Sequence, residues 1–535
     1  MSIFFPQLSI PAVAATSGYW TNYAESVDYT EDNTYTITSA EQLAWVASQV
    51  LDGNSFSGCT IKLGADIDLS GHYWVPIGKT VTYYFAGTFD GQNHVISNMT
   101  ISLPYSSINS GGFFGCVKGG IVQNLHLYNT AVSWSSNETP SSVFAGSLVG
   151  IFAGGSLINC SVNKATVSCA YKYSSSSSAS LKVGGLVGTS TISTGTMLNC
   201  CALNTTCSLT AAASIYLAAI GGLVGYGYGN MQNSFAIATL SASANTFFMG
   251  GFIGAAEPLS VFDNCYSSSA LSGIATTTLC AGGFIGYNRT TTVTNCFWNS
   301  ACGASTGYNG SVPSNLVSLT TEQMSNSSTF TNGSNMDMYL YQHLNTEASS
   351  ITDASTWSCN SKLLSYKPIL DNQYFVVSYD GNNNTGGTEP SSQYIFYGIT
   401  TNTVSSNSGS LTNTGYVFSG WNTAADGTGT AYSIGDAISG SQGNLTLYAQ
   451  WESESPTYSI TYYGNGNTSG YTYIKAYYSD GNAATIFDGT QDLSNIGYTF
   501  NGWNTTSDGS GTSYDSGDTI DLSSDLTLYA QWSES

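Results

Sequence analysis

Charge is scarce in this sequence, and positive charge is scarcest. Only 8% of the 535 residues are charged, with 10 Lys and Arg against 32 Asp and Glu, and the formal net charge is −22. Binding to a phosphate backbone needs basic patches, so this composition excludes nucleic acid as an expected partner. Residues 101–300 hold only Glu138, Glu257 and Asp263 as acids, which leaves an almost uncharged surface of Ser, Thr, Gly and Asn.

Long apolar runs are also missing. No stretch reaches the roughly 18–20 apolar residues that a membrane-spanning helix needs, so we expect no membrane insertion of this chain. Residues 3–15 resemble the end of a secretory signal, with Ala12-Val13-Ala14 as a small-residue cleavage site, but the basic segment is missing because the first cation is Lys62. An ordinary apolar N-terminal segment is the alternative. We assign residues 1–33 to this signal remnant and leader.

The sequence shows no recognisable cluster of catalytic or metal-binding residues. Glycoside hydrolysis needs two carboxylates facing one bond, and the few acids of residues 101–300 do not cluster. The pairs Asp426/Asp436 and Asp508/Asp518 fit turns better than Ca²⁺ sites, which collect more oxygen ligands at close spacing. None of the four histidines has a recognisable Ser or Cys nucleophile nearby in sequence: His72, His94, His126 and His343. We expect no catalytic residue, no metal and no cofactor.

Glycine and asparagine, in contrast, recur in a fixed pattern. A string of the type Gly-Gly-Leu-Val-Gly occurs six times, and its last glycines lie 35, 38, 37, 29 and 32 residues apart. The six copies begin at Gly111, Gly146, Gly184, Gly221, Gly250 and Gly282. An asparagine follows the end of each string by 8 to 11 residues, at Asn124, Asn159, Asn199, Asn233, Asn264 and Asn295.

This pattern predicts the fold class, a right-handed parallel β-helix. Each repeat contains three short apolar segments and no helical period, and a unit of this length cannot bury its apolar residues without stacking on its neighbours. We expect the glycines to be corner residues, because they tolerate positive φ and close backbone approach. We predict one capped β-helix over residues 34–374.

Helical caps are expected at the ends of the β-helix. Residues 39–51 combine a capping pair, Ser39 and Gln42, with apolar residues at helical spacing, and so predict an amphipathic helix that covers the first coil. Such a lid protects exposed strand edges from pairing with other chains. Thr320-Thr321-Glu322-Gln323 repeats the capping pattern, so we expect a second lid within 316–370.

The cysteines follow the same register. Of the twelve, Cys160, Cys200, Cys265 and Cys296 each come directly after a repeat asparagine, and we expect them to stack in a ladder about 4.8 Å apart. Equivalent positions on parallel strands point their Cβ atoms alongside one another rather than at each other, so we predict buried free thiols. Disulfides, common in exported proteins, are the alternative.

The Gly-Gly-Leu-Val-Gly strings, each followed by an asparagine and often a cysteine, resemble the GLUG repeat of large secreted and surface-attached microbial proteins. The resemblance covers about 110–300, and the coils before it are also similar. It implies an architecture shared by adhesin-like proteins and by IgA-peptidase-like proteins, and it does not imply a particular activity.

A second repeat, with a period of about 80 residues, occupies the C-terminal region. Gly415-Tyr416-Val417-Phe418-Ser419-Gly420-Trp421-Asn422 matches Gly497-Tyr498-Thr499-Phe500-Asn501-Gly502-Trp503-Asn504. The strand ending in Trp451 likewise matches the one ending in Trp532. These segments resemble the Listeria-Bacteroides repeat, which implies tandem β-grasp-like modules of cell-surface proteins. We assign the modules to 375–455 and 456–535, and expect further modules and an anchor beyond Ser535.

The variable part of each repeat predicts the binding face. From the asparagine to the next glycine string the length runs 22, 25, 22, 17 and 18 residues, and such insertions project from one side of a solenoid. We expect exposed aromatics there to bind a host or neighbouring-cell glycan or surface protein; the alternative is that they fold back onto the wall. These predicted ligand-binding residues are Trp134, Tyr171, Tyr173, Tyr216, Phe247 and Phe248.

The sequence therefore predicts an extracellular, cell-surface, non-catalytic adhesin-like protein. A non-catalytic scaffold fragment of a larger secreted protease or polysaccharide-degrading enzyme is the alternative, and an active carbohydrate enzyme is a more distant one.

Overall fold

A computed structural model describes most of the chain. The described residues are 18–30, 32–103, 109–136, 142–172, 177–212, 215–310, 313, 315–331, 337–359, 367–397, 402–438, 443–454, 457–471, 473–479, 483–489 and 493–535. The chain forms two compact units: residues 1–379 with 391–406 and 434–447, and residues 380–390 with 407–433 and 448–535.

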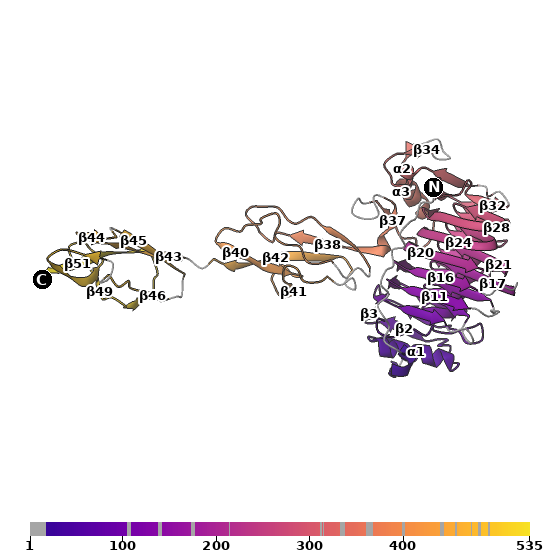
Figure 1. Ribbon diagram of the computed structural model, residues 1–535, viewed down its shortest axis with the longest axis horizontal. Helices are drawn as coiled ribbons and strands as arrows, with labels where there is room; N and C mark the ends of the chain where they lie inside the picture. Colours follow the sequence, from indigo (N-terminus) through magenta and orange to yellow (C-terminus); the bar gives the residue numbers. More distant parts are fainter. Residues whose placement is uncertain are drawn as a thin grey trace. The chain divides into compact units, whose positions relative to one another are not determined.

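Three parallel sheets build the stacked coils of the first unit (Figure 1). Sheet I contains β1 (Thr34–Ile37), β2 (Thr60–Leu63), β4 (Thr88–Asp90), β9 (Gly120–Gln123), β14 (Gly155–Ile158), β19 (Thr196–Leu198), β23 (Asn230–Gln232), β26 (Val261–Asp263) and β30 (Thr292–Thr294). Sheet III contains β8 (Phe114–Val117), β13 (Val149–Phe152), β18 (Val187–Ser190), β22 (Val224–Gly227), β25 (Ile253–Ala256), β29 (Ile285–Asn288) and β32 (Tyr308–Gly310).

Sheet II is the largest of the three and supplies two or three strands to most coils. It contains β3 (Ile67–Asp68), β5 (Val95–Ser97), β6 (Thr100–Leu103), β7 (Ser110–Gly111), β10 (His126–Tyr128), β11 (Ala131–Ser136), β12 (Val143–Gly146), β15 (Ser161–Asn163), β16 (Thr166–Tyr171), β17 (Ser177–Gly184), β20 (Cys201–Ala211), β21 (Ile215–Gly221), β24 (Phe235–Gly250), β27 (Tyr266–Ser267), β28 (Ala270–Gly282), β31 (Cys296–Asn299) and β33 (Leu316–Leu319). The parallel β-helix expected from the sequence is confirmed.

The repeat asparagines make the turn from sheet I to sheet II. All six have positive φ, at 51°, 54°, 55°, 49°, 55° and 51° in chain order. Their amides also form a ladder: Nδ2 of Asn199 donates to Oδ1 of Asn159 at 2.8 Å, and Nδ2 of Asn233 donates to Oδ1 of Asn199 at 2.7 Å. Asparagine tolerates left-handed backbone and carries both a donor and an acceptor, so one residue type makes the turn and ties successive coils together.

The repeat glycines serve close packing rather than left-handed turns. None of the first two glycines of the strings at Gly184, Gly221 and Gly250 has positive φ. A Cβ on Gly222 would lie 2.1 Å from the carbonyl oxygen of Gly251, so a larger residue cannot be accommodated between these coils. The expectation of close backbone approach is confirmed, whereas positive φ belongs to the asparagines instead.

The helix α1 (Ala40–Leu51) covers the N-terminal end of the coils, as predicted (Figure 1). The Ser39 side chain accepts a hydrogen bond from the backbone N–H of Gln42, and the Gln42 side chain accepts one from the backbone N–H of Thr38. Leu43 and Val46 are completely buried in the core that fills the coils. The short helix η1 (Trp20–Tyr23) precedes it.

The segment expected to form a second lid packs along the side of the coils. It contains β34 (Phe330–Thr331), β35 (Asp337–Met338), β36 (Trp357–Ser358), β37 (Ile369–Leu370), α2 (Thr321–Met324), α3 (Leu340–Ala348) and η3 (Asp371–Gln373). Four outward apolar side chains on successive coils pack against this segment in one buried cluster: Cys201, Phe235, Tyr266 and Phe297. The prediction of an end cap is therefore wrong, because an apolar stripe on the wall requires a lateral cover.

The asparagine ladder lies under the same segment. Asn199 donates to the carbonyl of Asp353 at 2.8 Å, and Asn233 accepts from the Trp357 indole at 2.6 Å.

Among the described helices, none has the length and apolar content that crossing a bilayer requires.

Each C-terminal module contains a five-stranded sheet with the same strand order. The first contains β38 (Tyr374–Asp380), β39 (Gln393–Phe396), β40 (Tyr416–Asn422), β41 (Ala431–Tyr432) and β42 (Leu445–Ser453). The second contains β43 (Thr457–Tyr463), β45 (Tyr473–Ser479), β48 (Tyr498–Asn504), β49 (Ser513–Tyr514) and β51 (Leu526–Glu534), with β44 (Ser469–Gly470), β46 (Ala484–Thr485), β47 (Leu493–Ser494) and β50 (Thr519–Ile520) in two small ribbons. Trp421 and Trp503 are buried, whereas Trp451 and Trp532 are half-buried.

All twelve cysteines are free thiols in the structure, and the four that follow the repeat asparagines are buried. The four thiols donate to backbone carbonyls: Cys160 to Val122 at 3.4 Å, Cys200 to Leu157 at 3.4 Å, Cys265 to Met231 at 3.5 Å and Cys296 to Thr294 at 3.1 Å. Burial raises the pKa of Cys160 and of Cys265 well above the usual range, which keeps both thiols protonated and unreactive.

Replacing Asn199 tests the ladder. Asn199→Ala removes hydrogen bonds to Asn159, Asn233 and Asp353 and forces alanine into a left-handed conformation. We expect a loss of about 1–3 kcal/mol for each buried group left without a partner, and about 1–2 kcal/mol more for the backbone. Asn199→Gly should lose less stability than Asn199→Ala. Glycine also loses the side-chain hydrogen bonds, but it adopts the left-handed conformation without the backbone cost. Equilibrium unfolding measures both, with exposed Asn22→Ala as control; a loss below about 0.5 kcal/mol for Asn199→Ala would contradict the ladder's role.

The thiol prediction is tested by mass. The protein, secreted into an oxidising compartment and purified without reductant, is denatured and alkylated, and the intact mass is measured. We expect alkylation of Cys160, Cys200, Cys265 and Cys296, because their side chains point alongside one another in the core. A mass lower by about 2 Da for each pair, with neither cysteine alkylated, would instead reveal disulfides.

Candidate binding face

Rows of hydroxyls cover the outer surface of sheet II where the repeats vary in length. Six serines stand in register on successive strands: Ser102, Ser133, Ser168, Ser208, Ser241 and Ser272. A parallel row two residues earlier consists of Thr100, Ala131, Thr166, Thr206, Thr239 and Ala270. Neighbouring members of a row are separated by the strand spacing of about 4.8 Å. We call these two rows the hydroxyl face.

The alternation of a β-strand explains why the hydroxyls point outward. The residues between the two rows, such as Val132, Val167 and Cys207, are buried in the core of the coils. Successive side chains of a strand point to opposite sides, so the Ser and Thr residues on either side of them face solvent. Neither row contains a charged side chain.

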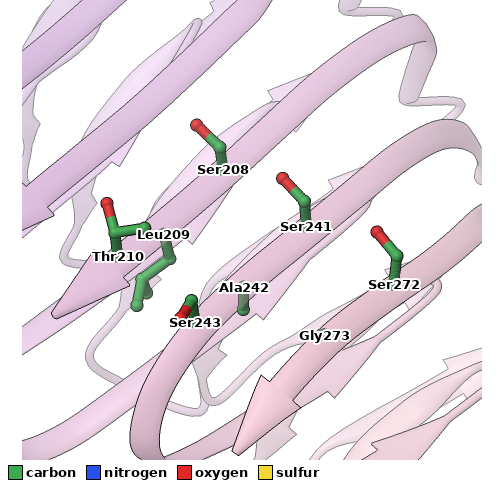
Figure 2. Close-up of a pocket in the computed structure, with 8 residues that line it drawn as sticks. All are labelled: Ser208, Leu209, Thr210, Ser241, Ala242, Ser243, Ser272 and Gly273. Atoms are coloured by element: carbon green, nitrogen blue, oxygen red, sulfur yellow. The ribbon is translucent and has the colours of Figure 1, made fainter. Parts of the chain in front are cut away.

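A shallow hollow of about 300 Å³ lies in this face. It is lined by Ser208, Leu209, Thr210, Ser241, Ala242, Ser243, Ser272 and Gly273 from β20, β24 and β28. Figure 2 shows the hydroxyls of Ser208, Ser241 and Ser272 pointing in the same direction from three neighbouring strands. Ser272 also donates to the carbonyl of Leu240 at 3.2 Å. The arrangement offers repeated hydrogen-bond donors and acceptors to a neutral ligand.

The predicted binding aromatics do not form one exposed group. Trp134, Tyr171 and Phe247 are buried, with 3%, 1% and 0% of their surface exposed, so their predicted exposure is wrong. The segment that holds them is strand rather than loop, and the period of two turns them into the core. The alternation Val132-Ser133-Trp134 was the signal that could have shown this.

The other three predicted aromatics have different positions. Tyr216 is 80% exposed on β21. Phe248 is half-buried and stacks on Tyr287, with ring centroids 4.9 Å apart. Tyr173 lies outside the described residues. The structure therefore does not bring the five described aromatics together into one exposed group. Sequence reasoning also missed the two hydroxyl rows of sheet II.

A small charged network lies on the outside of sheet III. Buried Glu257 accepts a hydrogen bond from the Tyr226 phenol and pairs with Arg289 at 3.4 Å. The ammonium of Lys182 lies 3.9 Å from the centre of the Tyr226 ring and donates to Thr189 at 3.4 Å. Burial lowers the pKa of Lys182 to about 8, and burial together with the Glu257 hydrogen bond raises that of Tyr226. The groups satisfy one another and tie coils together.

The histidines occupy structural positions. The His126 ring is buried, stacks on Tyr397 at 4.2 Å and hydrogen-bonds through Nδ1 to Ser161 Oγ at 2.7 Å. This Ser–His contact was not visible in the sequence, because Ser161 lies on the next coil. Burial lowers the pKa of His126 to about 3, so the ring is neutral, and the covering Tyr397 leaves the pair closed to a substrate. Nowhere in the described ranges do three metal-ligating side chains come together.

The buried aromatics make a prediction about stability. Trp134→Ala and Phe247→Ala should each lower the free energy of unfolding by about 3–5 kcal/mol, because each leaves a cavity in the core. Tyr216→Ala should change it by no more than about 0.5 kcal/mol, since that side chain is exposed. Urea unfolding of the three variants measures this, and equal effects at all three positions would refute the assignment of Trp134 and Phe247 to the core.

Comparison with known proteins assigns the C-terminal modules. Residues 375–450 and 458–531 match the model of the Listeria-Bacteroides repeat domain, which confirms the expectation for these residues. Two proteins of Evansella cellulosilytica are similar to parts of the chain. One, named "Putative Gly-rich membrane protein", is 33% identical over 164 residues, 30% of this chain. The other, "Putative membrane protein", is 39% identical over 90 residues, 17% of this chain. The matched regions span only 18% and 13% of these relatives.

Two solved structures overlap with the chain. A crystal structure from Bacteroides ovatus, described as a "putative immunoglobulin A1 protease", is 19% identical, with a TM-score of 0.40 and coverage of 59% of this chain and 95% of that one. A structure named "IgA1 Protease" is 20% identical, with a TM-score of 0.38 and coverage of 54% of this chain and 22% of that one. Within this chain, the Listeria-Bacteroides repeat model thus matches the two C-terminal modules, at residues 375–450 and 458–531.

Proposed function

We propose that this chain is the non-catalytic binding part of an extracellular, cell-surface, adhesin-like protein, and that its β-helix binds a neutral glycan through the hydroxyl face. The observation that carries this proposal is the pair of register-matched, uncharged Ser and Thr rows. The proposal includes the prediction that residues 110–300 are GLUG-type repeats, and the parallel coils support this prediction.

The surface location has separate support. The Listeria-Bacteroides repeats implied tandem modules of surface proteins, and the two Evansella cellulosilytica relatives are named as membrane proteins. The absence of catalysis is also part of the proposal, and it is supported by the closed Ser161–His126 pair and by the internally satisfied Glu257 network.

The chemistry of the face favours a neutral polyol. Hydroxyls both donate and accept, so they pair with sugar hydroxyls in either direction. One such hydrogen bond contributes only about 0.5–1.5 kcal/mol net, because it replaces bonds to water. Affinity must therefore come from several contacts along a row, and the coil stack provides six in-register positions. A charged ligand would find no partner in either row and would lose hydration.

The test is a glycan-binding screen on the full chain, followed by titration with the best neutral oligosaccharide. Ser241→Lys places a long charged side chain in the centre of the face, and we expect it to weaken binding at least tenfold. Ser208→Ala combined with Ser272→Ala should weaken it about 5- to 150-fold, since two hydrogen bonds of about 0.5–1.5 kcal/mol each are lost.

The matched control is Ser516→Ala combined with Ser533→Ala, which removes two exposed hydroxyls from the second module. We expect the control to bind like the unchanged protein, and circular dichroism to show the same fold for all variants. Lack of binding to every neutral glycan, or equal binding by Ser241→Lys, would reject the hydroxyl face as the binding site.

A further inference from the structure

The second C-terminal module exposes an edge strand rich in tyrosine. Strand β45 stands at the edge of the sheet ordered β45-β43-β51-β48-β49. Its residues Tyr473, Lys475 and Tyr477 alternate with partly buried neighbours and therefore share one side of the sheet. The two tyrosines are 60% and 70% exposed, far above the level expected for side chains that pack in a core.

Two further tyrosines extend this side across the sheet. Tyr463 on β43 stands opposite Tyr473, and Tyr529 on β51 stands opposite Tyr463. The Tyr463 ring centroid lies 6.0 Å from that of Tyr473 and 5.4 Å from that of Tyr529, with interplanar angles of 31° and 16°. Three rings thus form a row over three strands, and we call them, with Lys475 and Tyr477, the tyrosine platform.

Hydroxyls stand next to the rings. Thr461 is the register partner of Lys475, and Thr527 is in turn the register partner of Thr461. The side of the sheet therefore carries a row of tyrosines followed by a row with one cation and two threonines. This combination of apolar ring surface and hydrogen-bonding groups suits a sugar, whose C–H faces contact rings and whose hydroxyls accept and donate.

The platform also holds the only cation in the sequence after Lys367. The ammonium of Lys475 lies 5.3 Å from the centre of the Tyr477 ring. Over the described part of this module, no carboxylate lies within ion-pair distance of Lys475. Asp525 accepts hydrogen bonds from the backbone N–H and hydroxyl of Ser459 at 2.8 and 2.9 Å, and the Lys475 charge adds to these bonds in lowering the pKa of its carboxyl group. One positive charge is thus placed among exposed rings in an otherwise acidic module.

The first module lacks the platform although it has the same sheet order. By the aligned Gly-Asn motif, Asp380 occupies the position of Tyr463. Of the four platform tyrosines, only two have a tyrosine counterpart in the first module: Tyr448 for Tyr529 and Tyr394 for Tyr477. In the first module β39 begins at Gln393, and Pro390, the counterpart of Tyr473, precedes it. Because the first module forms the same sheet order without Tyr463 and Tyr473, these two tyrosines are not required by the sheet order.

We propose that the tyrosine platform binds a sugar residue that carries a carboxylate, with the Lys475 ammonium pairing the carboxylate and the tyrosine rings contacting the sugar. A tyrosine ring offers a rigid apolar surface at low entropic cost, and its hydroxyl remains available for hydrogen bonds. A single exposed ion pair contributes only about 0–1 kcal/mol, so the rings must supply most of the affinity and Lys475 the preference for an acidic sugar. The site is independent of the hydroxyl face.

The test is titration calorimetry of the full chain with 3′-sialyllactose, tri-galacturonic acid and neutral lactose. We expect one or both acidic probes to bind more tightly than lactose, and the comparison identifies the source of the carboxylate. Lys475→Gln should remove the preference over lactose, and Tyr473→Ser should weaken all binding about tenfold or more. Raising the salt from 50 to 500 mM should reduce the preference, because the ion pair is exposed.

The matched controls separate the platform from the rest of the chain. Tyr498→Ser removes an exposed tyrosine of the same module outside the platform and should leave binding unchanged. Tyr463→Asp installs the residue of the first module and should abolish binding, with an unchanged circular dichroism spectrum. The proposal is overturned if neither acidic probe binds, or if Lys475→Gln and Tyr473→Ser bind as the unchanged protein does. Ser241→Lys should leave the binding of acidic sugars intact. The proposals for the hydroxyl face and for the tyrosine platform can therefore be rejected independently.

Discussion

The in-register stacking of coils is the constraint on which the rest of the structure depends. Each coil must place its residues directly over their counterparts, because a slip by one position would turn every core side chain to solvent. Two local devices hold the register. Asparagine amides connect successive turns, as between Asn159, Asn199 and Asn233, and glycines such as Gly222 let backbones approach where no Cβ fits.

Register also determines the surface chemistry. Once coils stack, a residue type repeated at one position becomes a row across the protein, so serine at one position becomes the six-member row from Ser102 to Ser272. The same rule creates the apolar stripe of Phe235, Tyr266 and Phe297, which side chains of the later segment, such as Leu344 and Trp357, cover. Polar rows remain open to solvent and apolar rows are covered, which leaves the hydroxyl rows as an extended surface for a partner.

The sequence predicted what local repetition encodes. The glycine strings and asparagines indicated the coils, and Ser39 with Gln42 indicated the covering helix. It could not show the lateral cover, because the Asn199–Asp353 contact joins residues 154 positions apart without any shared motif. Trp134 and Phe247 were misplaced for another reason: variable length suggested a loop, whereas strands of up to 16 residues absorb the insertions and turn alternate side chains inward. The partnership of His126 with Ser161 likewise depends on stacking alone.

The most direct test of this account is the distance between two members of the serine row in solution. Spin labels attached to Ser133→Cys and Ser272→Cys are four coils apart, which at about 4.8 Å for each coil places their backbones roughly 19 Å apart. The native cysteines provide the background, measured on the unchanged protein, and most of them are buried. The account predicts one narrow distance distribution near this value once the label length is included. A broad distribution, or one centred well beyond about 35 Å, would contradict in-register stacking and with it the hydroxyl face.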